Sequence, residues 1–566
     1  MRGRTTARGF VAGGLLAIAL GLLIADGLAA QVPFARLRDA LSEPHNWLTY
    51  SGTYFSQRYS ELDEITTANV GDLQLQWVYQ TPVFGPWQST PLVVDGVMYL
   101  TQRPNDIVAL DARTGRVFWI YEYPTPSDHR ACCGSNNRGV AALGDRLFMS
   151  TLDAHIVAID AVTGAELWDV EAADKHLAYS FTGAPLAVKD KVIVGTAGGD
   201  RGVRGFITAL DAETGDEVWR FHTIPGPGEP GHETWEPCPP NPETYCDPEA
   251  WKHGGAPAWL TGSYDPELNL TYWGIGNPGP DFYREQRPGD NLYSNSVVAL
   301  DADTGELRWH FQYDYDSVQI PVLADIERGG TLFKVMLWAN RNGFYYVLDR
   351  ATGRFFTGLP FVSVNWAEGL DDSGRPIETP QPPGAPTYPG IQGATNWYSP
   401  AYSPRTELFY IPAWEDYATV FGGAPQEYEA GQRFVGGGPD GPRGYAPVAG
   451  APGLPGLTRG PINRWTDAVG HGAVLAVDAL TGEQKWKFEL TDVISSGILT
   501  TAADLLFTGA RSGYFQALDA RTGDLLWKAS LGGQIVNGPM TYEVDGTQYV
   551  AVIAGNALST FALRNR

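Results

Sequence analysis

Cysteine and several familiar catalytic motifs are scarce or absent in this sequence. Its 566 residues include only four cysteines, and they contain no H-E-x-x-H, no paired C-x-x-C, no G-x-S-x-G and no C-x-x-C-H. One G-x-G-x-x-G runs from Gly274 to Gly279, but Pro278 and Pro280 prevent the helix on which a dinucleotide phosphate would rest. The nine histidines are scattered without ligand spacing, so we expect them to be structural. Rossmann dehydrogenases and a c-type haem on this chain are thereby excluded.

Positive charge is scarce as well. The chain has 40 lysine and arginine residues against 64 aspartate and glutamate residues, which gives a formal net charge of −24. A surface of this sign argues against binding to nucleic acid or to anionic membranes, and it favours a basic partner.

Residues 1–30 have the composition of a secretory signal peptide. Three arginines precede an apolar or glycine run from Phe10 to Ile24, which is short for a spanning helix, and small residues follow up to Ala30. We expect cleavage near Ala30, secretion to the periplasm or another oxidising space, and no membrane span in the mature chain. Without the +2 of the signal peptide the net charge is about −26. Residues 31–566 are expected to form a single domain.

A hairpin motif recurs along the chain, with an apolar strand, an Asp-x-x-Thr-Gly turn and a second strand that ends in Trp. The glycine supplies the positive φ of the turn, and the Asp and Thr side chains can bond its backbone. Spacings of 49 and 51 residues between successive tryptophans correspond to one four-stranded propeller blade. The copies are 107–119, 156–168, 207–219, 297–309, 474–486 and 515–527, with a degraded one at 345–356.

An eighth copy is divided between the two ends of the chain. Residues 73–77 resemble the final strand of a blade, and residues 557–563 resemble the strand before the turn. Pairing them would close a ring and remove free sheet edges. The sequence therefore predicts an all-β fold, an eight-bladed β-propeller closed by its N- and C-terminal strands.

Three stretches interrupt the repeat: 225–256, 357–395 and 421–465. Insertions of this kind usually cover one face, where function tends to lie. The first contains Cys238 and Cys246, for which we expect a local disulfide that pins the loop.

Polar residues gather in the loops and at the beginnings of blades. Asp200 stands among glycines after a strand, Asn277 ends another strand, and Asp314 and Asp316 are expected on one face of a third. Carboxylate and amide oxygens suit calcium or a similar hard cation. Each residue alone is more simply explained as part of a turn or of a solvated strand.

Cys132 and Cys133 are adjacent, and neighbouring Cα atoms lie about 3.8 Å apart, closer than the roughly 4.4–6.8 Å of an ordinary disulfide. This pair and other motifs together resemble the pyrroloquinoline-quinone (PQQ)-dependent alcohol dehydrogenases, the quinoprotein methanol and ethanol dehydrogenases. The resemblance covers nearly all of the mature chain. It rests on the blade repeats and on TPLVVDGVMY (90–99), CCGSNNRG (132–139), GVRGFITALD (202–211), GNPGPD (276–281), RPGDNLYSNS (287–296) and ANRNGFYYVLDR (339–350).

The resemblance implies a site for PQQ and for Ca²⁺ or a lanthanide ion. Cys132–Cys133 would be a disulfide against one face of the quinone, and Trp259 would stack on the other. The metal ligands would be Asp200 and Asn277, joined by Asp314 and Asp316. Further cofactor contacts would come from Gln88, Arg138, Thr182, Gly198, Gly199, Arg341 and Asn396.

The implied reaction is oxidation of an alcohol, or of an aldehyde. The metal would polarise the quinone carbonyl, a base would remove the hydroxyl proton, and hydride would pass to the quinone. Asp314 is the first choice for the base and Asp316 the second, with Arg341 beside the quinone oxygens. Electrons would then leave to a separate one-electron acceptor, for which a soluble, basic c-type cytochrome is expected. The oligomeric state stays open.

Three departures from the family pattern leave alternatives open. Asp200 replaces the usual Glu, the segment before Asp314 is contracted, and Ser495 stands where a Trp often lies under the cofactor. An Asp two places after the base resembles the lanthanide-using branch. One alternative is a non-catalytic periplasmic binding propeller of the kind that helps to assemble outer-membrane proteins. Another is a homologue that binds the quinone but turns over poorly.

Overall fold

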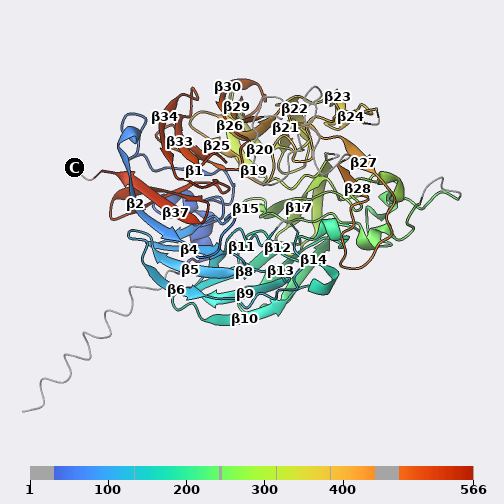
Figure 1. The fold of residues 1–566 in the computed structure, drawn as a ribbon, viewed down its shortest axis with the longest axis horizontal. Coiled ribbons are helices and arrows are strands. Elements are labelled where there is room, and N and C mark those ends of the chain that lie inside the picture. The colour runs from blue at the N-terminus through green and yellow to red at the C-terminus, as the bar shows by residue number, and fades with distance from the viewer. Residues whose placement is uncertain are drawn as a thin grey trace, which may run out of the picture.

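The chain forms a ring of eight β-sheets around a central axis, as the computed structural model shows (Figure 1). The structure describes residues 31–564 except Cys133, 241–244, Asp314, Pro383 and 440–470, so the predicted signal peptide lies outside the described residues. Each sheet contains an antiparallel meander of four strands, and the eight-bladed β-propeller is confirmed. No helix in the described part of the chain is both long and apolar enough to cross a membrane.

The blades follow one another along the chain, and we number them from the first complete one. Blade 1 contains β3 (Leu92–Val94), β4 (Val97–Gln102), β5 (Asp106–Asp111) and β6 (Val117–Tyr121). Blade 2 contains β7 (Ala141–Leu143), β8 (Arg146–Ser150), β9 (His155–Asp160) and β10 (Glu166–Glu171). Blade 3 contains β11 (Leu186–Val188), β12 (Lys191–Gly195), β13 (Phe206–Asp211) and β14 (Glu217–His222). Blade 4 contains β15 (Ser263–Asp265), β16 (Leu270–Gly274), β17 (Ser296–Asp301) and β18 (Leu307–Gln312).

The second half of the ring is built in the same way. Blade 5 contains β19 (Val322–Arg328), β20 (Thr331–Ala339), β21 (Phe344–Asp349) and β22 (Phe355–Pro360). Blade 6 contains β25 (Ala401–Ser403), β26 (Leu408–Glu415), β29 (His471–Asp478) and β30 (Gln484–Leu490). Blade 7 contains β31 (Ile498–Thr501), β32 (Leu505–Gly509), β33 (Tyr514–Asp519) and β34 (Leu525–Ser530), with β1 (Tyr59–Ser60) added in parallel to β31. Blade 8 contains β35 (Met540–Val544), β36 (Thr547–Ala554), β37 (Ala557–Leu563) and β2 (Leu73–Gln80).

Blade 8 joins the two ends of the described chain. β2, near the N-terminus, pairs with β37 at the C-terminus from Leu73 opposite Leu563 to Gln80 opposite Ala557. This is the predicted ring closure, and it leaves neither strand as a free sheet edge.

The repeated hairpin explains how neighbouring blades hold together. In blade 4 the turn residue Gly305 has φ +71°, and a Cβ at this position would lie only 2.5 Å from Trp219 of blade 3. The same indole donates its N–H to the carbonyl of Ala302, in the same turn, at 3.1 Å. The Trp of one blade therefore packs on the Asp-x-x-Thr-Gly turn of the next, and the turn must present a glycine.

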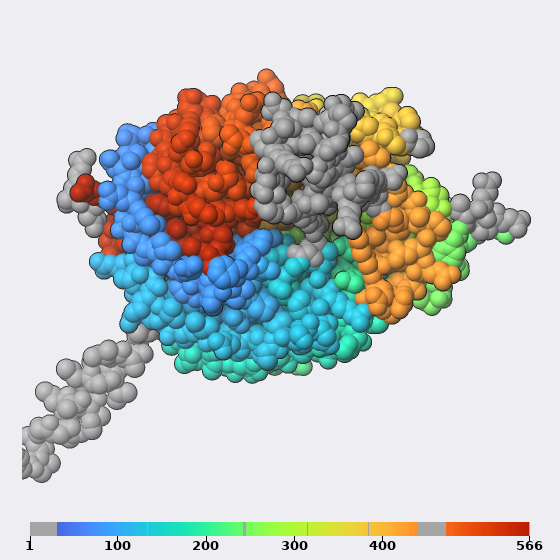
Figure 2. All heavy atoms as spheres, in the orientation of Figure 1, coloured from blue at the N-terminus to red at the C-terminus, as the bar shows by residue number. Residues whose placement is uncertain are grey.

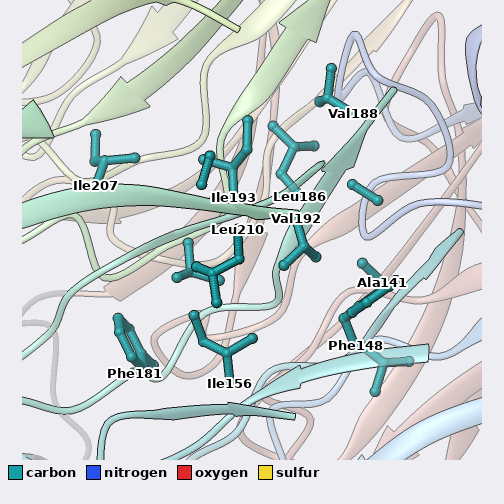
Figure 3. Close-up of a cluster of buried hydrophobic side chains, with 14 of the residues drawn as sticks. Ala141, Phe148, Ile156, Phe181, Leu186, Val188, Val192, Ile193, Ile207 and Leu210 are labelled. Atoms are coloured by element: carbon teal, nitrogen blue, oxygen red, sulfur yellow. The ribbon is translucent and has the colours of Figure 1, made fainter. Parts of the chain in front are cut away.

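Apolar side chains fill the space between blades. Because both faces of an inner strand are covered, these strands are apolar without alternation. Figure 3 shows Phe148 and Ile156 of blade 2 beside Val192 and Leu210 of blade 3.

Short elements lie outside the blades. The helix α2 (Phe34–Arg38) and the 3₁₀ helices η1 (Ala40–Ser42) and η2 (Val70–Asp72) belong to the N-terminal segment. The 3₁₀ helices of the connections are η3 (Lys175–Leu177), η4 (Gly199–Arg201), η5 (His232–Thr234), η6 (Ala250–His253) and η7 (Arg284–Gln286). Two ribbons, β23 (Ala367–Leu370) with β24 (Pro376–Glu378) and β27 (Phe421–Gly423) with β28 (Gly437–Pro439), lie in the insertions.

The three insertions belong to one face of the ring. In an antiparallel meander, the connections after the second and fourth strands emerge at the same end of a blade. Residues 225–256 follow the fourth strand β14, residues 357–395 begin within the fourth strand β22, and residues 421–465 follow the second strand β26. The first and third insertions also touch, since His253 of the first stacks on Tyr428 of the third with ring centroids 4.1 Å apart. Phe421 of β27 stacks on Phe282, in the connection between β16 and β17, with ring centroids 5.7 Å apart, and the space-filling view shows orange residues beside green ones at the right of the molecule (Figure 2). A disulfide joins Cys238 to Cys246 in the first insertion.

Candidate functional site

A cavity of about 430 Å³ opens among the connections on the face that carries the insertions. Two of the predicted site residues, Cys133 and Asp314, lie outside the described residues. All the others line this cavity: Gln88, Cys132, Arg138, Thr182, Gly198, Gly199, Asp200, Trp259, Asn277, Asp316, Arg341 and Asn396.

The propeller topology explains why residues so distant in sequence meet. Asp200, Asn277 and Arg341 follow β12, β16 and β20, the second strands of three consecutive blades. Cys132 and Trp259 lie in connections from a fourth strand to the next blade. Both kinds of connection emerge on the same face, so each blade delivers side chains to the common axis.

Arg138 is buried in the wall of the cavity between two indole rings. Its guanidinium carbon lies 5.0 Å from the ring centroid of Trp259 and 5.2 Å from that of Trp397. One guanidinium N–H donates to the carbonyl of Thr182 at 3.0 Å, while Nε has no hydrogen-bond partner among the described residues. Burial lowers the pKa of Arg138 to about 10, so it stays a cation at neutral pH. A buried cation with an unused donor suits an anionic ligand.

Acidic side chains gather at one end of the cavity around Asn277. The charges of Asp200 and Asp316 act on Asp281, and burial together with these charges raises the pKa of Asp281 well above its usual range. Arg341 pairs with Asp316 through its guanidinium. Cys132 Sγ lies 2.6 Å from Asp200 Oδ2, so the cysteine loop adjoins this acidic end. The carboxylates and the amide oxygen of Asn277 fit a hard cation.

Cys132 carries no free thiol, since the described residues include no free cysteine. Its predicted partner, Cys133, lies outside the described residues, so the pairing stays a prediction.

The expectation that Asp314 and Asp316 share one face of a strand is wrong. β18 ends at Gln312, which lies opposite Ser296, the first residue of β17. Tyr313 N–H donates one further bond to the carbonyl of Asn295 at 2.7 Å, and the described residues after it belong to no strand before β19, apart from a single bridge between Ser317 and Ile275. Asp316 therefore lies in the connection between blades 4 and 5, and Asp314 lies outside the described residues.

A larger cavity of about 1160 Å³ adjoins the first. We call the larger one the vestibule and the first one the inner cavity. The vestibule and the inner cavity share five lining residues: Cys132, Asp200, Asn277, Asp316 and Arg341. The acidic end thus lies where the two spaces meet. The remaining wall of the vestibule includes aromatic and charged side chains of the connections, among them Phe282, Tyr315, Trp366, Phe421 and Arg375.

Several residues that line the two cavities were not predicted from the sequence. Asp281 ends the GNPGPD motif that also supplies Asn277, so a signal for it was present. Arg103 and Arg511 follow β4 and β32, again second strands, but no local motif marks them. Ser495 does line the cavity, as its place in the family pattern suggested.

Comparisons with known proteins agree with this geometry. A family model described as "PQQ: Glucose/ethanol/alcohol dehydrogenase, beta-propeller domain" matches residues 47–365. The quinohemoprotein alcohol dehydrogenase ADH-IIG of Pseudomonas putida is 38% identical over 592 residues, covering 97% of this chain and 78% of the relative. The quinoprotein alcohol dehydrogenase PedH of Pseudomonas putida is 36% identical, covering 94% and 90%.

Solved structures give the same result. That of ADHIIG from Pseudomonas putida HK5 matches with a TM-score of 0.85 and 34% identity, covering 95% of this chain and 83% of the other. A europium-containing methanol dehydrogenase matches with a TM-score of 0.81 and 33% identity, covering 94% and 100%. A second family model, described as the outer membrane protein assembly factor BamB, matches only residues 470–565. The chain belongs to the family of PQQ-dependent alcohol dehydrogenases. It is therefore an oxidoreductase.

Proposed function

We propose that this protein oxidises an alcohol with PQQ bound in the inner cavity and a Ca²⁺ or lanthanide ion bound at its acidic end. The observation that carries the proposal is the convergence of twelve predicted residues on one cavity. When bound, PQQ supplies the two-electron oxidant that takes hydride from the alcohol carbon, and the metal acts as a Lewis acid.

The inner cavity suits a flat, anionic cofactor. Buried polar atoms without partners in the described chain indicate where a polar ligand would bind, since such atoms are normally paired. They include Arg138 Nε and Gln88 Oε1, and both residues line the cavity. Arg138, Thr182 and Asn396 would hold the carboxylates and carbonyls of the quinone. Trp259 and the Cys132–Cys133 pair would lie against its two faces.

The metal would be held by Asp200 and Asn277, with Asp314 and Asp316 completing the oxygen ligands. One solved relative is named for its metal, the europium-containing methanol dehydrogenase, which supports including a lanthanide among the candidates.

Proton abstraction falls to the connection between blades 4 and 5. Arg341 already pairs with Asp316, so this carboxylate has a cationic partner. We therefore assign Asp314 as the general base that takes the alcohol proton, and Asp316 as the second choice. Arg341 would orient both the Asp316 carboxylate and the quinone oxygens. An alcohol would enter through the vestibule, which meets the inner cavity at these residues.

Electrons would pass to a separate soluble c-type cytochrome, and the −26 charge favours a basic one. Residues 1–30 would direct the chain to the periplasm and be removed, leaving 31–566 as one domain.

Reconstitution tests the proposal. The purified chain is loaded with PQQ and either Ca²⁺ or La³⁺, and reduction of an artificial dye is followed with a series of alcohols. We expect PQQ to be taken up and the dye to be reduced only when alcohol is present. Absence of PQQ uptake would refute the enzyme and favour a binding propeller. Uptake without turnover would favour a homologue that binds the quinone but does not oxidise alcohol.

A further inference from the structure

Part of the vestibule wall carries arginine side chains for which the proposed function has no use. Arg201 directly follows Asp200 at the end of η4, and Arg433 belongs to the third insertion. Both line the vestibule, and neither lines the inner cavity. Arg130 lies two residues before Cys132, which lines both spaces. We call Arg130, Arg201 and Arg433 the arginine cluster.

The third insertion brings the arginine cluster together. Phe434 N–H donates to the carbonyl of Asp200 at 2.7 Å, so the insertion is joined to the connection that contains Arg201. The carbonyl oxygen of Gly431 accepts hydrogen bonds from Arg130 Nη1 at 2.8 Å and from Arg201 Nη1 at 3.4 Å. Two guanidinium groups thus converge on one oxygen atom, and the third member of the cluster follows two residues further along the insertion.

The arginine cluster has no carboxylate to balance its charge. None of its three members forms an ion pair with a described residue. Asp128, two residues before Arg130, pairs with Lys175 at 2.8 Å instead. Three other arginines of the vestibule do have carboxylate partners: Arg284 with Glu378, Arg375 with Asp290, and Arg341 with Asp316. Unbalanced positive charge is therefore confined to one part of the vestibule wall.

Such a cluster favours an anion in the space that it lines. Arginines are charged at any physiological pH, and neighbouring guanidinium groups repel one another. A carboxylate beside them removes the repulsion and accepts the parallel hydrogen bonds that a guanidinium donates. Arg201 and Arg433 do not line the inner cavity, so this anion is distinct from the quinone. Because Arg201 directly follows Asp200, an anion at the cluster and a hydroxyl at the metal can belong to one molecule.

We propose that the arginine cluster binds the carboxylate of the substrate and that this protein oxidises ω-hydroxycarboxylates, alcohols with a carboxylate at the far end of the chain. The carbon of the CH₂OH group would lose a hydride to the quinone, and its hydroxyl would lose a proton to Asp314. The product is the ω-oxocarboxylate, with the original carboxylate unchanged. The inference deepens the proposed function and rests on it for the place where the hydroxyl reacts.

Relative specificity of the reconstituted enzyme is the first test. ω-Hydroxyhexanoate and n-hexanol present the same reacting group on chains of equal length and differ in the charged end. We expect Arg433→Gln to lower the ratio of their kcat/KM values by about three- to ten-fold, because one guanidinium no longer attracts the carboxylate. Arg433 is exposed and its guanidinium makes no hydrogen bond with a described residue, so the variant leaves the contacts of Gly431 in place.

Arg284→Gln is the matched control. It removes the same charge from another part of the vestibule, but from an arginine that already pairs with Glu378. The ratio of kcat/KM values should stay within two-fold of that of the parent chain. A fall as large as that in Arg433→Gln would show that only the total charge of the vestibule matters, and it would overturn the assignment to the arginine cluster.

Hexanoate gives a readout that does not depend on turnover, since it has no hydroxyl to oxidise. Ligand-observed NMR titrations with the full chain, with and without PQQ, measure its affinity. We expect Arg433→Gln to weaken hexanoate binding by about three- to ten-fold. Arg433→Glu should also raise the kcat/KM for the cationic ω-aminohexanol relative to n-hexanol, a gain that a folding defect would not produce.

Either of two results for Arg433→Gln would overturn the inference: a ratio of kcat/KM values within two-fold of the parent, or an unchanged affinity for hexanoate. The arginine cluster would then serve only to anchor the third insertion through Gly431. The proposed function fails by a different result, if the parent chain takes up no PQQ or oxidises no alcohol, and hexanoate binding can be measured in either case.

Discussion

Arg138 is a single residue whose surroundings would suit the anionic cofactor proposed above. Two indole rings cover the faces of its guanidinium, and the Thr182 carbonyl holds one of its N–H groups. These contacts fix the side chain, so little conformational entropy remains to be lost on binding. They leave Nε available, and no carboxylate among the described residues pairs with the charge.

Replacing Arg138 with Met tests this role. The variant keeps an aliphatic side chain between the indoles but removes the charge that would face the quinone carboxylates. Loss of one partner of a buried charge pair costs about 2–5 kcal/mol, so the affinity for PQQ should fall by roughly 30- to 3,000-fold. Quenching of tryptophan fluorescence during titration with PQQ measures the affinity. Arg113→Ala, at an exposed position, is the control, and a loss of less than three-fold in Arg138→Met would contradict the assignment.

At the scale of elements, the contact between a Trp and the next hairpin turn is the unit that repeats around the ring. Gly305 combines two requirements, a positive φ and the close approach of Trp219. Gly329, in the turn between β19 and β20, has a positive φ of +62° but no neighbouring atom within 4 Å of an added Cβ. Comparing substitutions at these two glycines therefore separates the energetic cost of backbone strain from the cost of packing against the indole.

Gly305→Ala should destabilise the protein by about 2–4 kcal/mol, because it adds overpacking against an indole to the strain of a left-handed alanine. Gly329→Ala should cost only the backbone share, about 1–2 kcal/mol. Denaturant unfolding followed by tryptophan fluorescence compares the two variants. Equal destabilisation would show that the Trp219 contact carries no weight.

The strands and turns also show which features of the fold and of the site can be predicted from the sequence. The turn motif gave blade number, ring closure and the face of the insertions, because each is set by local turn chemistry and strand count. Site residues after second and fourth strands could be placed by topology alone. The end of β18 could not, since it depends on where β17 begins and not on the alternation of residues 313–317. Arg103 and Arg511 were not predicted for a related reason: a single arginine carries no local motif, and only the folded structure shows that both line the same cavity.

For the whole molecule, charge is the property that bears on partners. A net charge of about −26 on the chain without its predicted signal peptide, residues 1–30, would attract a basic cytochrome over distances set by ionic strength. Close contacts inside the cavity are shielded much less by salt. Electron transfer between proteins and oxidation of alcohol should therefore respond differently to salt.

We expect the rate constant for reduction of a basic c-type cytochrome to fall by about ten-fold or more between low salt and 0.5 M KCl. Reduction of an uncharged dye by the same preparation should change little and serves as the control. Stopped-flow absorbance of the cytochrome measures the rate. A flat salt response would argue against an electrostatically guided partner.

Because β2 pairs with β37, the N-terminal strand β2 can join its blade only after the C-terminal strand has been made. Until Ala557–Leu563 has been added, β2 has no neighbour and β36 offers an open edge, so a chain that stops early exposes two unpaired strands. A chain that is synthesised from its N-terminus must therefore reach this final segment before the ring can close. The ring can therefore close only when β37 is present. Chains that end before β37 would keep exposed strand edges and would be more sensitive to proteases.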